Sequence, residues 1–167
     1  SSIATVGNYE YGFFWYFYQD GGIEYEIKLT GIVNSAGVAP GIKPKHGTLV
    51  APQVVAHNHQ HFFNVRLDMM VDGINNSAYE IDTILDPKSE ENKHGNAFST
   101  KKTLIENESD GVRIVDPFSA RSWAITNNSK KNYMGESVSY KIFPGENVLP
   151  FSHKDSVVNK RAGFMNG

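Results

Sequence analysis

The chain has 167 residues and contains no cysteine. This absence excludes a disulfide framework, a cysteine-bound zinc finger and a thiolate nucleophile. Any metal ion bound by this chain would have to be held by histidine, carboxylate or carbonyl groups.

The sequence also lacks a strong charge of either sign and a long apolar run. Its formal net charge of −2 gives no electrostatic reason to expect nucleic acid or an anionic membrane as a partner. The apolar run at residues 11–18 has about half the length that a transmembrane helix needs. We therefore expect no nucleic-acid partner and no membrane segment.

Neither end of the sequence has the features of a natural terminus. The chain begins at Ser1 without a methionine, enters an apolar segment almost at once, and stops shortly after Phe164. We therefore expect a piece of a larger protein. The compartment stays open at this point, and peroxisomal, periplasmic and secreted locations are all compatible with the sequence.

The chain is rich in aromatic residues and in short alternating segments. Residues 23–33 alternate apolar and polar types and contain many β-branched and aromatic residues, which is typical of half-buried strands. Turn-forming clusters separate such runs, among them residues 19–22 and 127–129. The other runs of this kind are residues 49–56, 60–71, 79–85, 112–115, 122–126 and 137–143. This spacing predicts an all-β chain folded as an antiparallel β-sandwich.

Three histidines alternate in the segment that begins at His57 and continues through His59 to His61. On a strand, all three would project to the same side, with neighbours about 6.6 Å apart along the axis. One adjacent pair could converge on a metal ion, whereas the outer pair lies too far apart to share it. Imidazole ligands without thiolate favour copper or zinc over calcium or magnesium. The alternative is a solvent-facing cluster or a pH-sensitive patch.

A metal site of the cupin type is disfavoured by the residues that follow the histidines. Cupin sandwiches also use a His-x-His pair, but they place a glutamate ligand a few residues further along the same strand. This chain has Asn64, Val65 and Arg66 at those positions.

The aromatic segment near the N-terminus contains the run Asn8-Tyr9-Glu10-Tyr11. Taken alone, it would be interpreted as a core strand. Together with the histidine segment, it resembles the Asn-Tyr-(Asp/Glu)-Tyr signature of copper-containing amine oxidases. The separation of 50 residues between Tyr9 and His59, taken as the difference of their numbers, is similar to that of the family. Residues 66–73, 75–77, 121–123 and 135–142 add to the resemblance, which covers essentially the whole chain.

The resemblance implies a role for four residues of the two motifs. Tyr9 would be the precursor of the quinone cofactor topaquinone, and Asn8 would be its packing neighbour. His59 and His61 would be two of three copper(II) ligands. His57 precedes the His-x-His pair of the family and would not bind copper.

The resemblance also implies what this chain would not contain. The third copper histidine and the catalytic aspartate of the family fall outside residues 1–167. We therefore expect residues 1–167 to be a fragment of one catalytic β-sandwich domain, without the N-terminal domains and the C-terminal part of the sandwich. Asp68, through its carboxylate, and Met69, through its backbone carbonyl, match part of a peripheral calcium site. Some members have a further aspartate where this chain has Met70.

The activity implied by the resemblance is that of a primary-amine oxidase. Such an enzyme converts a primary amine to an aldehyde, consumes dioxygen, and releases ammonium and hydrogen peroxide. The family resemblance also implies a homodimer. Two alternatives remain open: a non-catalytic metal-binding β-sandwich module, and an inactive truncated homologue. We also raise the hypothesis that Gly7 gives the Tyr9 ring room to swing.

Overall fold

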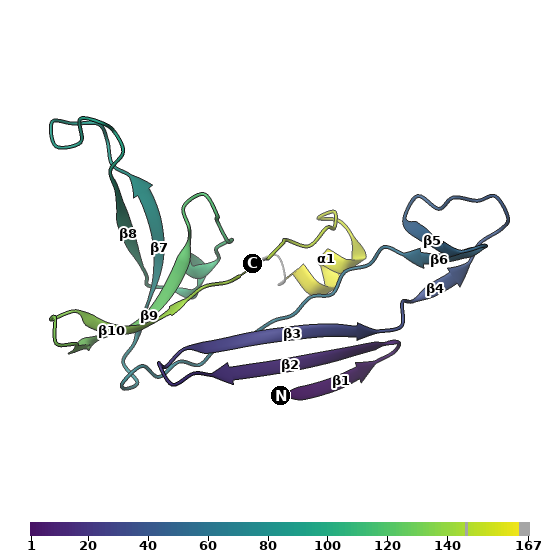
Figure 1. Cartoon of the computed structure of the whole chain (residues 1–167), viewed down its shortest axis with the longest axis horizontal. Coiled ribbons are helices and arrows are strands. Elements are labelled where there is room, and N and C mark those ends of the chain that lie inside the picture. Colours follow the sequence, from purple (N-terminus) through teal and green to yellow (C-terminus); the bar gives the residue numbers. More distant parts are fainter. Residues whose placement is uncertain (146, 164–167) are drawn as a thin grey trace. The chain divides into compact units, whose positions relative to one another are not determined.

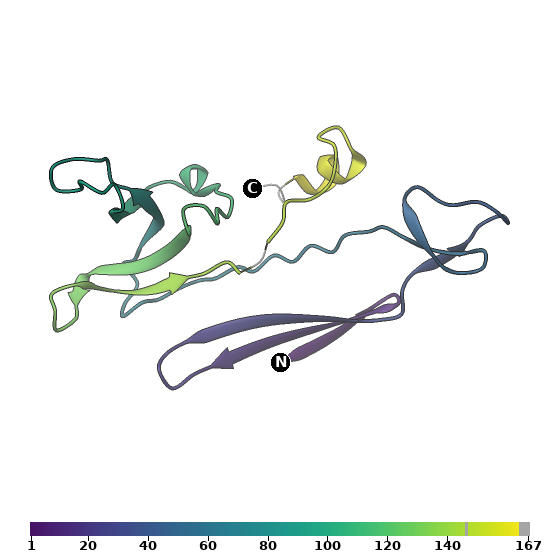
Figure 2. The ribbon, with the colours of Figure 1, turned by 45° about the horizontal axis from the view of Figure 1, so that its top comes forward.

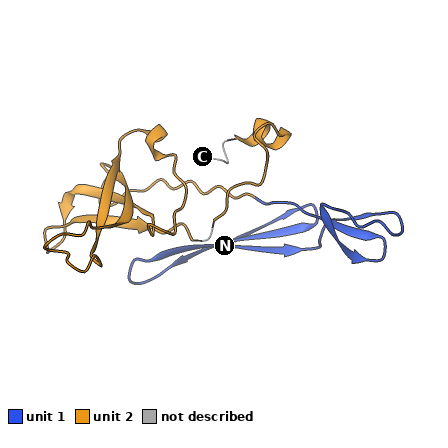
Figure 3. Ribbon diagram, turned by 90° about the horizontal axis from the view of Figure 1, so that it is seen from above, with its two compact units in different colours: residues 1–61 blue, residues 62–167 orange. Residues whose placement is uncertain are grey.

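The computed structural model describes residues 1–145 and 147–163, and most of the regular structure in these residues is β-strand. The chain divides into two compact units, Ser1–His61 and Phe62–Gly167, coloured separately in Figure 3. The first unit contains β1 (Ser2–Val6), β2 (Tyr9–Phe17), β3 (Ile23–Gly31), β4 (Ser35–Gly37), β5 (Gly47–Ala51) and β6 (Val54–His57). The second contains β7 (Ser77–Leu85), β8 (Phe98–Ile105), the 3-10 helix η1 (Glu108–Gly111), β9 (Ser122–Lys131), β10 (Ser137–Ile142) and α1 (Val157–Ala162).

A three-stranded antiparallel sheet opens the first unit, and β2 is its central strand (Figures 1 and 2). A two-residue turn of Gly7 and Asn8 joins β1 to β2, because Val6 pairs directly with Tyr9. Gly7 has a φ of +60°, which the first loop residue of a type II′ hairpin turn requires. Strand β2 then pairs with β3 along its whole length, from Tyr9 opposite Gly31 to Phe17 opposite Ile23.

A second small sheet of the first unit has the order β4-β6-β5 and leads to the histidines. Residues 49–56, predicted as one strand, form a hairpin whose turn lies at Pro52 and Gln53. Proline has no amide hydrogen for a ladder, and Gln53 has a positive φ of 60°, so the chain reverses there. The last residue of β6 is His57, which pairs with Gly47.

The second unit is built on an antiparallel sheet of the order β10-β9-β7-β8 (Figure 1). Residues 127–129, predicted as a turn, instead continue β9 as far as Lys131. The physical reason is the burial of Asn127, whose amide donates to the backbone oxygens of Val71 and Asp72 at 3.1 and 3.0 Å. A buried polar side chain with partners is tolerated in a strand, so the turn is postponed to residues 133–135.

Two further strand predictions are wrong in the described chain. Residues 60–71 lie in the segment 58–76, which belongs to no sheet of the described residues and is drawn as a line in Figures 1 and 2. Residues 112–115 are likewise not a strand. The alternating pattern reports burial of alternate side chains, whereas a strand also needs a neighbouring strand for its backbone hydrogen bonds.

The expectation of an all-β, antiparallel chain is confirmed, because every strand pairing in the described residues is antiparallel. Strands β1, β4 and β8 were not foreseen among the alternating runs. No helix among the described residues is long and apolar enough to cross a bilayer.

Candidate functional site

Tyr9 begins the central strand of the first sheet and is held in place by a close backbone approach. It pairs with Val6 on one side and with Gly31 on the other. A Cβ atom at Gly31 would come within 2.8 Å of the Tyr9 Cα and would collide with the Asn8 carbonyl oxygen. Gly31 also has a φ of +119°, which side chains rarely tolerate. Glycine is therefore required opposite Tyr9.

Gly7 has a simpler role than the one we hypothesised. A Cβ atom at this position would meet nothing within 4 Å, so the glycine does not clear space for the Tyr9 ring. Its positive φ instead belongs to the turn that starts β2 at Tyr9.

The hydroxyl of Tyr9 takes part in a directed chain of hydrogen bonds. The backbone N–H of Asn34 donates to the Tyr9 Oη at 3.2 Å. The same oxygen lies 2.9 Å from Nε2 of His59, and Nδ1 of His59 lies 2.9 Å from the carbonyl oxygen of His57. A carbonyl oxygen only accepts, so His59 carries its proton on Nδ1 and donates it to His57. Nε2 of His59 therefore accepts the hydroxyl proton of Tyr9.

A second tyrosine–histidine pair lies beside the first. The hydroxyl of Tyr11 is 2.8 Å from Nδ1 of His61. The ring centroids of His59 and His61 are 4.8 Å apart, and the Tyr9 ring is 4.9 Å from the His61 ring. The four rings thus form one cluster within the first unit.

The two pairs have the same separation of 50 residues in the sequence. Residues two apart on a strand share a face, so Tyr9 and Tyr11 present their rings on one side of β2. The segment carrying His59 and His61 therefore runs along this face in the same direction as β2. The prediction that all three histidines lie on a paired strand is wrong, because β6 ends at His57 and the other two follow in the unpaired segment.

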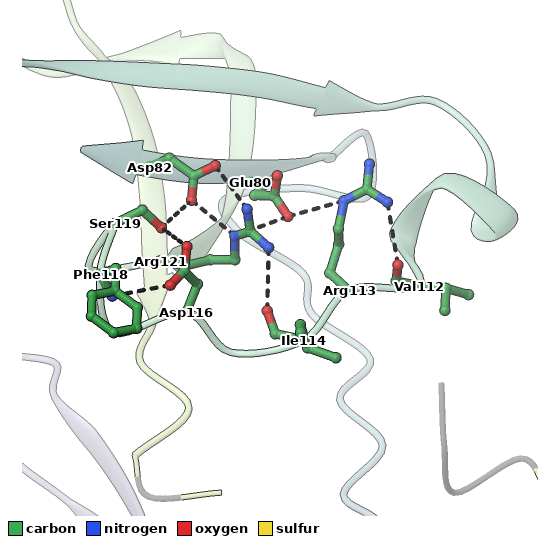
Figure 4. Close-up of polar contacts among 9 residues, drawn as sticks. All are labelled: Glu80, Asp82, Val112, Arg113, Ile114, Asp116, Phe118, Ser119 and Arg121. Carbon is green, nitrogen blue, oxygen red and sulfur yellow. Dashed lines mark hydrogen bonds and ion pairs between the residues drawn. The ribbon is translucent and has the colours of Figure 1, made fainter. Parts of the chain in front are cut away.

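The second unit has a polar cluster of a different kind (Figure 4). Arg121 forms two parallel hydrogen bonds with Asp82, at 2.8 Å from Nε and 3.0 Å from Nη2. Glu80, with only 7% of its side chain exposed, lies 3.1 Å from Arg113 and 3.4 Å from Arg121. Ser119 donates to Asp82 and to Asp116, at 3.0 and 2.8 Å.

These contacts have electrostatic consequences for the two aspartates. The hydrogen bonds from Arg121 hold the pKa of Asp82 below its ordinary value, and the hydrogen bond from Ser119 does the same for the pKa of Asp116. Both carboxylates are therefore stabilised in the ionised form. The cluster fastens the loop that leads to β9 onto strand β7, and we find no role for it in chemistry.

Comparison with known proteins identifies the family. The sequence profile of the copper amine oxidase enzyme domain matches residues 1–167. The chain belongs to the copper amine oxidase family. It is 41% identical over 169 residues to a peroxisomal copper-containing diamine oxidase of Nicotiana tabacum, covering 99% of this chain and 22% of that protein. It is 44% identical over 164 residues to a histamine oxidase of Arthrobacter globiformis, covering 98% of this chain and 24% of that protein.

A solved structure gives the same result for the fold. The copper-containing benzylamine oxidase from Hansenula polymorpha matches with a TM-score of 0.91 at 33% identity, over 99% of this chain and 26% of that one. The expected fold class, the antiparallel β fold of the copper amine oxidase catalytic domain, is confirmed, as is the resemblance to the family. The chain spans about a quarter of the length of these relatives.

The donor set at the tyrosine–histidine cluster fits the copper expected of a copper amine oxidase. Two imidazoles lie with their rings 4.8 Å apart, and each has its Nδ1 within 3 Å of an oxygen atom. Copper-ligating histidines commonly bind through one ring nitrogen while the other is hydrogen-bonded to an outer group. Within residues 1–145 and 147–163, no group of three or more histidine or carboxylate side chains is placed to hold a metal. The cluster thus offers two imidazole nitrogens, on His59 and His61, as candidate ligands.

The remaining predicted site residues are Asn8, Asp68 and Met69. Asn8 is exposed in the turn before β2, and its backbone carbonyl accepts from the Ile32 N–H at 2.8 Å. Asp68 is exposed and Met69 is half-buried, both in the part of the unpaired segment 58–76 that belongs to the second unit. The assignment of calcium to these two residues stays a prediction. So do the individual roles of Tyr9, Asn8, His59 and His61.

Sequence reasoning did not predict the roles of three residues at this site. Tyr11 entered only as part of the Asn8–Tyr11 motif, and Gly31 and Asn34, which contact Tyr9, were not predicted. A glycine ending an alternating strand, followed by Ile32, Val33 and Asn34, was the available signal for a close backbone approach.

Proposed function

We propose that this chain is part of the catalytic β-sandwich domain of a primary-amine oxidase that uses copper(II) and a topaquinone formed from Tyr9. The whole protein would oxidise a primary amine to an aldehyde and release ammonium and hydrogen peroxide. The observation that carries the proposal is the 2.9 Å contact between the Tyr9 hydroxyl and Nε2 of His59. A phenol bonded to the nitrogen of a metal-binding histidine lies where a bound metal would act on it.

Copper supplies the redox chemistry that converts the phenol with dioxygen, and the quinone supplies an electrophilic carbonyl and an electron sink for the amine. The chain itself contributes position. The Asn34 N–H donates to the Tyr9 oxygen, and His59 accepts the hydroxyl proton. The Nε2 lone pair of His59 would be taken by copper, so in the metal-bound site this nitrogen could not also hold the proton of the phenol. The contact instead places the phenol oxygen beside the expected metal position, where the Asn34 amide would stabilise the negative charge of the deprotonated oxygen.

The neighbouring residues restrict the ring to this arrangement. Tyr9 is half-buried, and its ring meets the His61 ring edge-on with an interplanar angle of 80°. The turn at Gly7 and Asn8 and the glycine at position 31 fix the backbone on both sides of β2. Orienting a reacting group before reaction lowers the entropic part of the barrier.

Three further features belong to the same proposal. A catalytic aspartate and a third copper histidine would come from parts of the protein outside residues 1–167. Asp68 and Met69 would supply part of a peripheral calcium site. The full-length protein would be a homodimer, as the family resemblance implies.

The test is mass spectrometry of the peptide around Tyr9, taken from full-length protein reconstituted with copper in air. Conversion to topaquinone adds two oxygen atoms to the tyrosine and removes two hydrogen atoms. We expect this mass change at Tyr9 after copper addition and not in protein kept without copper. An unmodified Tyr9 in copper-loaded protein would contradict the proposal and favour a non-catalytic metal-binding module or an inactive homologue.

A further inference from the structure

We propose that Tyr11 is a positioning residue for His61. The Tyr11 hydroxyl holds the His61 imidazole in the tautomer and orientation that copper binding needs. The inference rests on the proposed function and goes beyond it, because it assigns a role to a residue that is neither a ligand nor the cofactor precursor. It begins with the 2.8 Å contact between the Tyr11 hydroxyl and Nδ1 of His61.

The chemistry of imidazole fixes what this contact does when a metal is bound. A neutral imidazole carries one proton, and a metal takes the lone pair of the nitrogen that lacks it. With Nδ1 of His61 beside the Tyr11 oxygen, the ring binds a metal through Nε2 when Nδ1 carries the proton and donates it to that oxygen. An oxygen acceptor in this position fixes the ring orientation and raises the basicity of the ligand.

The two histidines of the cluster are held by different kinds of group. His59 donates to the backbone carbonyl of His57, which no side-chain substitution removes. His61 depends instead on a side-chain hydroxyl, which a single substitution removes. The cluster therefore offers a direct comparison of the two ligands.

Tyr11 is anchored well enough to act as such a support. It lies within the central strand β2, paired with Ala4 of β1 and Leu29 of β3. Its side chain is half-buried, and its ring centroid lies 5.6 Å from that of His61. A hydroxyl on a strand paired at both edges loses little further freedom when it holds a histidine.

The experiment compares Tyr11→Phe with Tyr16→Phe in the full-length protein. Tyr16 lies on the same strand but on its other face, and its hydroxyl donates to Glu26 at 2.7 Å, so the control removes a hydroxyl without touching the histidines. Metal-free protein is titrated with Cu(II) without oxygen, against a competing chelator. We expect Tyr11→Phe to weaken copper binding about 10- to 100-fold, and Tyr16→Phe to leave it unchanged.

A double-mutant cycle distinguishes positioning from a general structural effect. If Tyr11 acts through His61, adding Tyr11→Phe to His61→Ala should change the residual copper affinity by less than about twofold. Added to His59→Ala, the same substitution should retain its full effect. The electron paramagnetic resonance spectrum of Cu(II) should change in Tyr11→Phe and not in Tyr16→Phe, because the nitrogen ligation differs.

Each result decides between the two levels of the proposal. Equal copper affinity and equal spectra in wild type and Tyr11→Phe would overturn the role of Tyr11, as would an effect that persists undiminished in His61→Ala. Copper affinities of His59→Ala and His61→Ala that equal the wild-type affinity would overturn the proposed function itself. If Tyr11→Phe has a lower thermal unfolding midpoint than Tyr16→Phe, the double-mutant cycle still distinguishes positioning of His61 from a general structural effect.

Discussion

The two polar clusters of this chain hold their side chains by different means. In the first unit, phenols and imidazoles are joined by short hydrogen bonds between neutral groups, and His59 is exposed. In the second unit, the contacts join full charges that are largely buried, with 18% of the Arg121 side chain and 14% of the Asp82 side chain exposed. The first arrangement leaves imidazole nitrogens that a metal could bind, whereas in the second the charged groups are paired with one another.

This difference explains why one cluster suits chemistry and the other suits stability. Breaking a buried ion pair leaves an uncompensated charge and costs several kcal/mol. Breaking a neutral hydrogen bond in a half-exposed cluster costs about 1 kcal/mol. Substitutions in the tyrosine–histidine cluster should therefore alter metal and quinone chemistry with little loss of stability, and those in the ion-pair cluster of the second unit should do the reverse.

The largest effect is expected at Tyr9. Tyr9→Phe should abolish quinone absorbance and phenylhydrazine labelling in the full-length protein, because the ring then lacks the oxygen from which the quinone is made. The thermal unfolding midpoint should stay close to that of wild type. Tyr16→Phe is the matched control for labelling, since it removes a hydroxyl from the other face of the same strand and keeps Tyr9. Labelling that persists in Tyr9→Phe would refute the assignment.

The next effect concerns the three histidines. His59→Ala and His61→Ala should each lose copper and leave Tyr9 unmodified, as measured by metal analysis and by the peptide mass. His57→Ala should retain copper, because His59 is held by the backbone carbonyl of His57, which alanine keeps. Equal copper loss in all three variants would contradict the assignment of His59 and His61 as the copper-binding pair.

In the second unit, Asp82→Ala should lower the free energy of unfolding by about 3 kcal/mol, since Arg121 would lose both of its parallel hydrogen bonds. The matched control is Glu90→Ala, whose side chain is 93% exposed in its pair with Lys93 and should cost less than about 1 kcal/mol. Urea unfolding measures both. Copper binding should be unchanged in Asp82→Ala, and a loss of copper there would contradict the separate roles of the two clusters.

A smaller effect is expected at Gly31. Gly31→Ala combines an unfavourable φ with a collision against the backbone at Asn8, and should cost about 1–3 kcal/mol. Because the collision lies beside Tyr9, quinone formation should slow as well. Gly41→Ala is the control: it has a similar positive φ of +77°, but a Cβ atom there meets nothing within 4 Å. Equal quinone formation rates in the two variants would show that the close approach is unimportant.

The smallest effect is a dependence of stability on acid. The pKa of Asp82 is lowered in the folded protein, chiefly by hydrogen bonds from Arg121, so its stabilising contribution is present above the ordinary aspartate pKa of about 4. It is lost as the pH falls through the lowered folded-state value. The urea midpoint should therefore decline below about pH 4, and Asp82→Ala should decline less steeply. A steeper decline of the urea midpoint in Asp82→Ala than in wild type would contradict the stabilising role of the Asp82–Arg121 pair.

The sequence indicated the residues of the candidate site better than their geometry. The alternation of His57, His59 and His61 predicted a metal-binding pair, but nothing local showed that the strand ends at His57, because strand pairing depends on distant residues. The continuation of β9 through Asn127 depended in the same way on a backbone carbonyl 56 residues away, at Val71. Local propensity favoured a turn there, and burial overrode it.

The close contacts around Tyr9 were equally beyond local reasoning. Gly31 and Asn34 act on Tyr9 only because β3 folds back on β2 in a fixed register. Tyr11 was visible as part of a motif, yet its hydroxyl gains a meaning only when the segment with His61 lies along the same face. Such contacts are properties of the folded chain.

The pairing of Gly47 with His57 has a consequence for the register of the histidine segment. Because the three histidines alternate, a slip of two residues that brought His57 to Tyr9 would also bring His59 to Tyr11, so each tyrosine would still face an imidazole, but the wrong one. A Cβ atom at Gly47 would press within 2.6 Å of Val55 and 2.7 Å of the Ala56 oxygen, so this glycine allows β5 to clamp the end of β6. Because His57 is held in that ladder, the residues that follow it start from a fixed position. The segment with His59 and His61 therefore has a single register against Tyr9 and Tyr11.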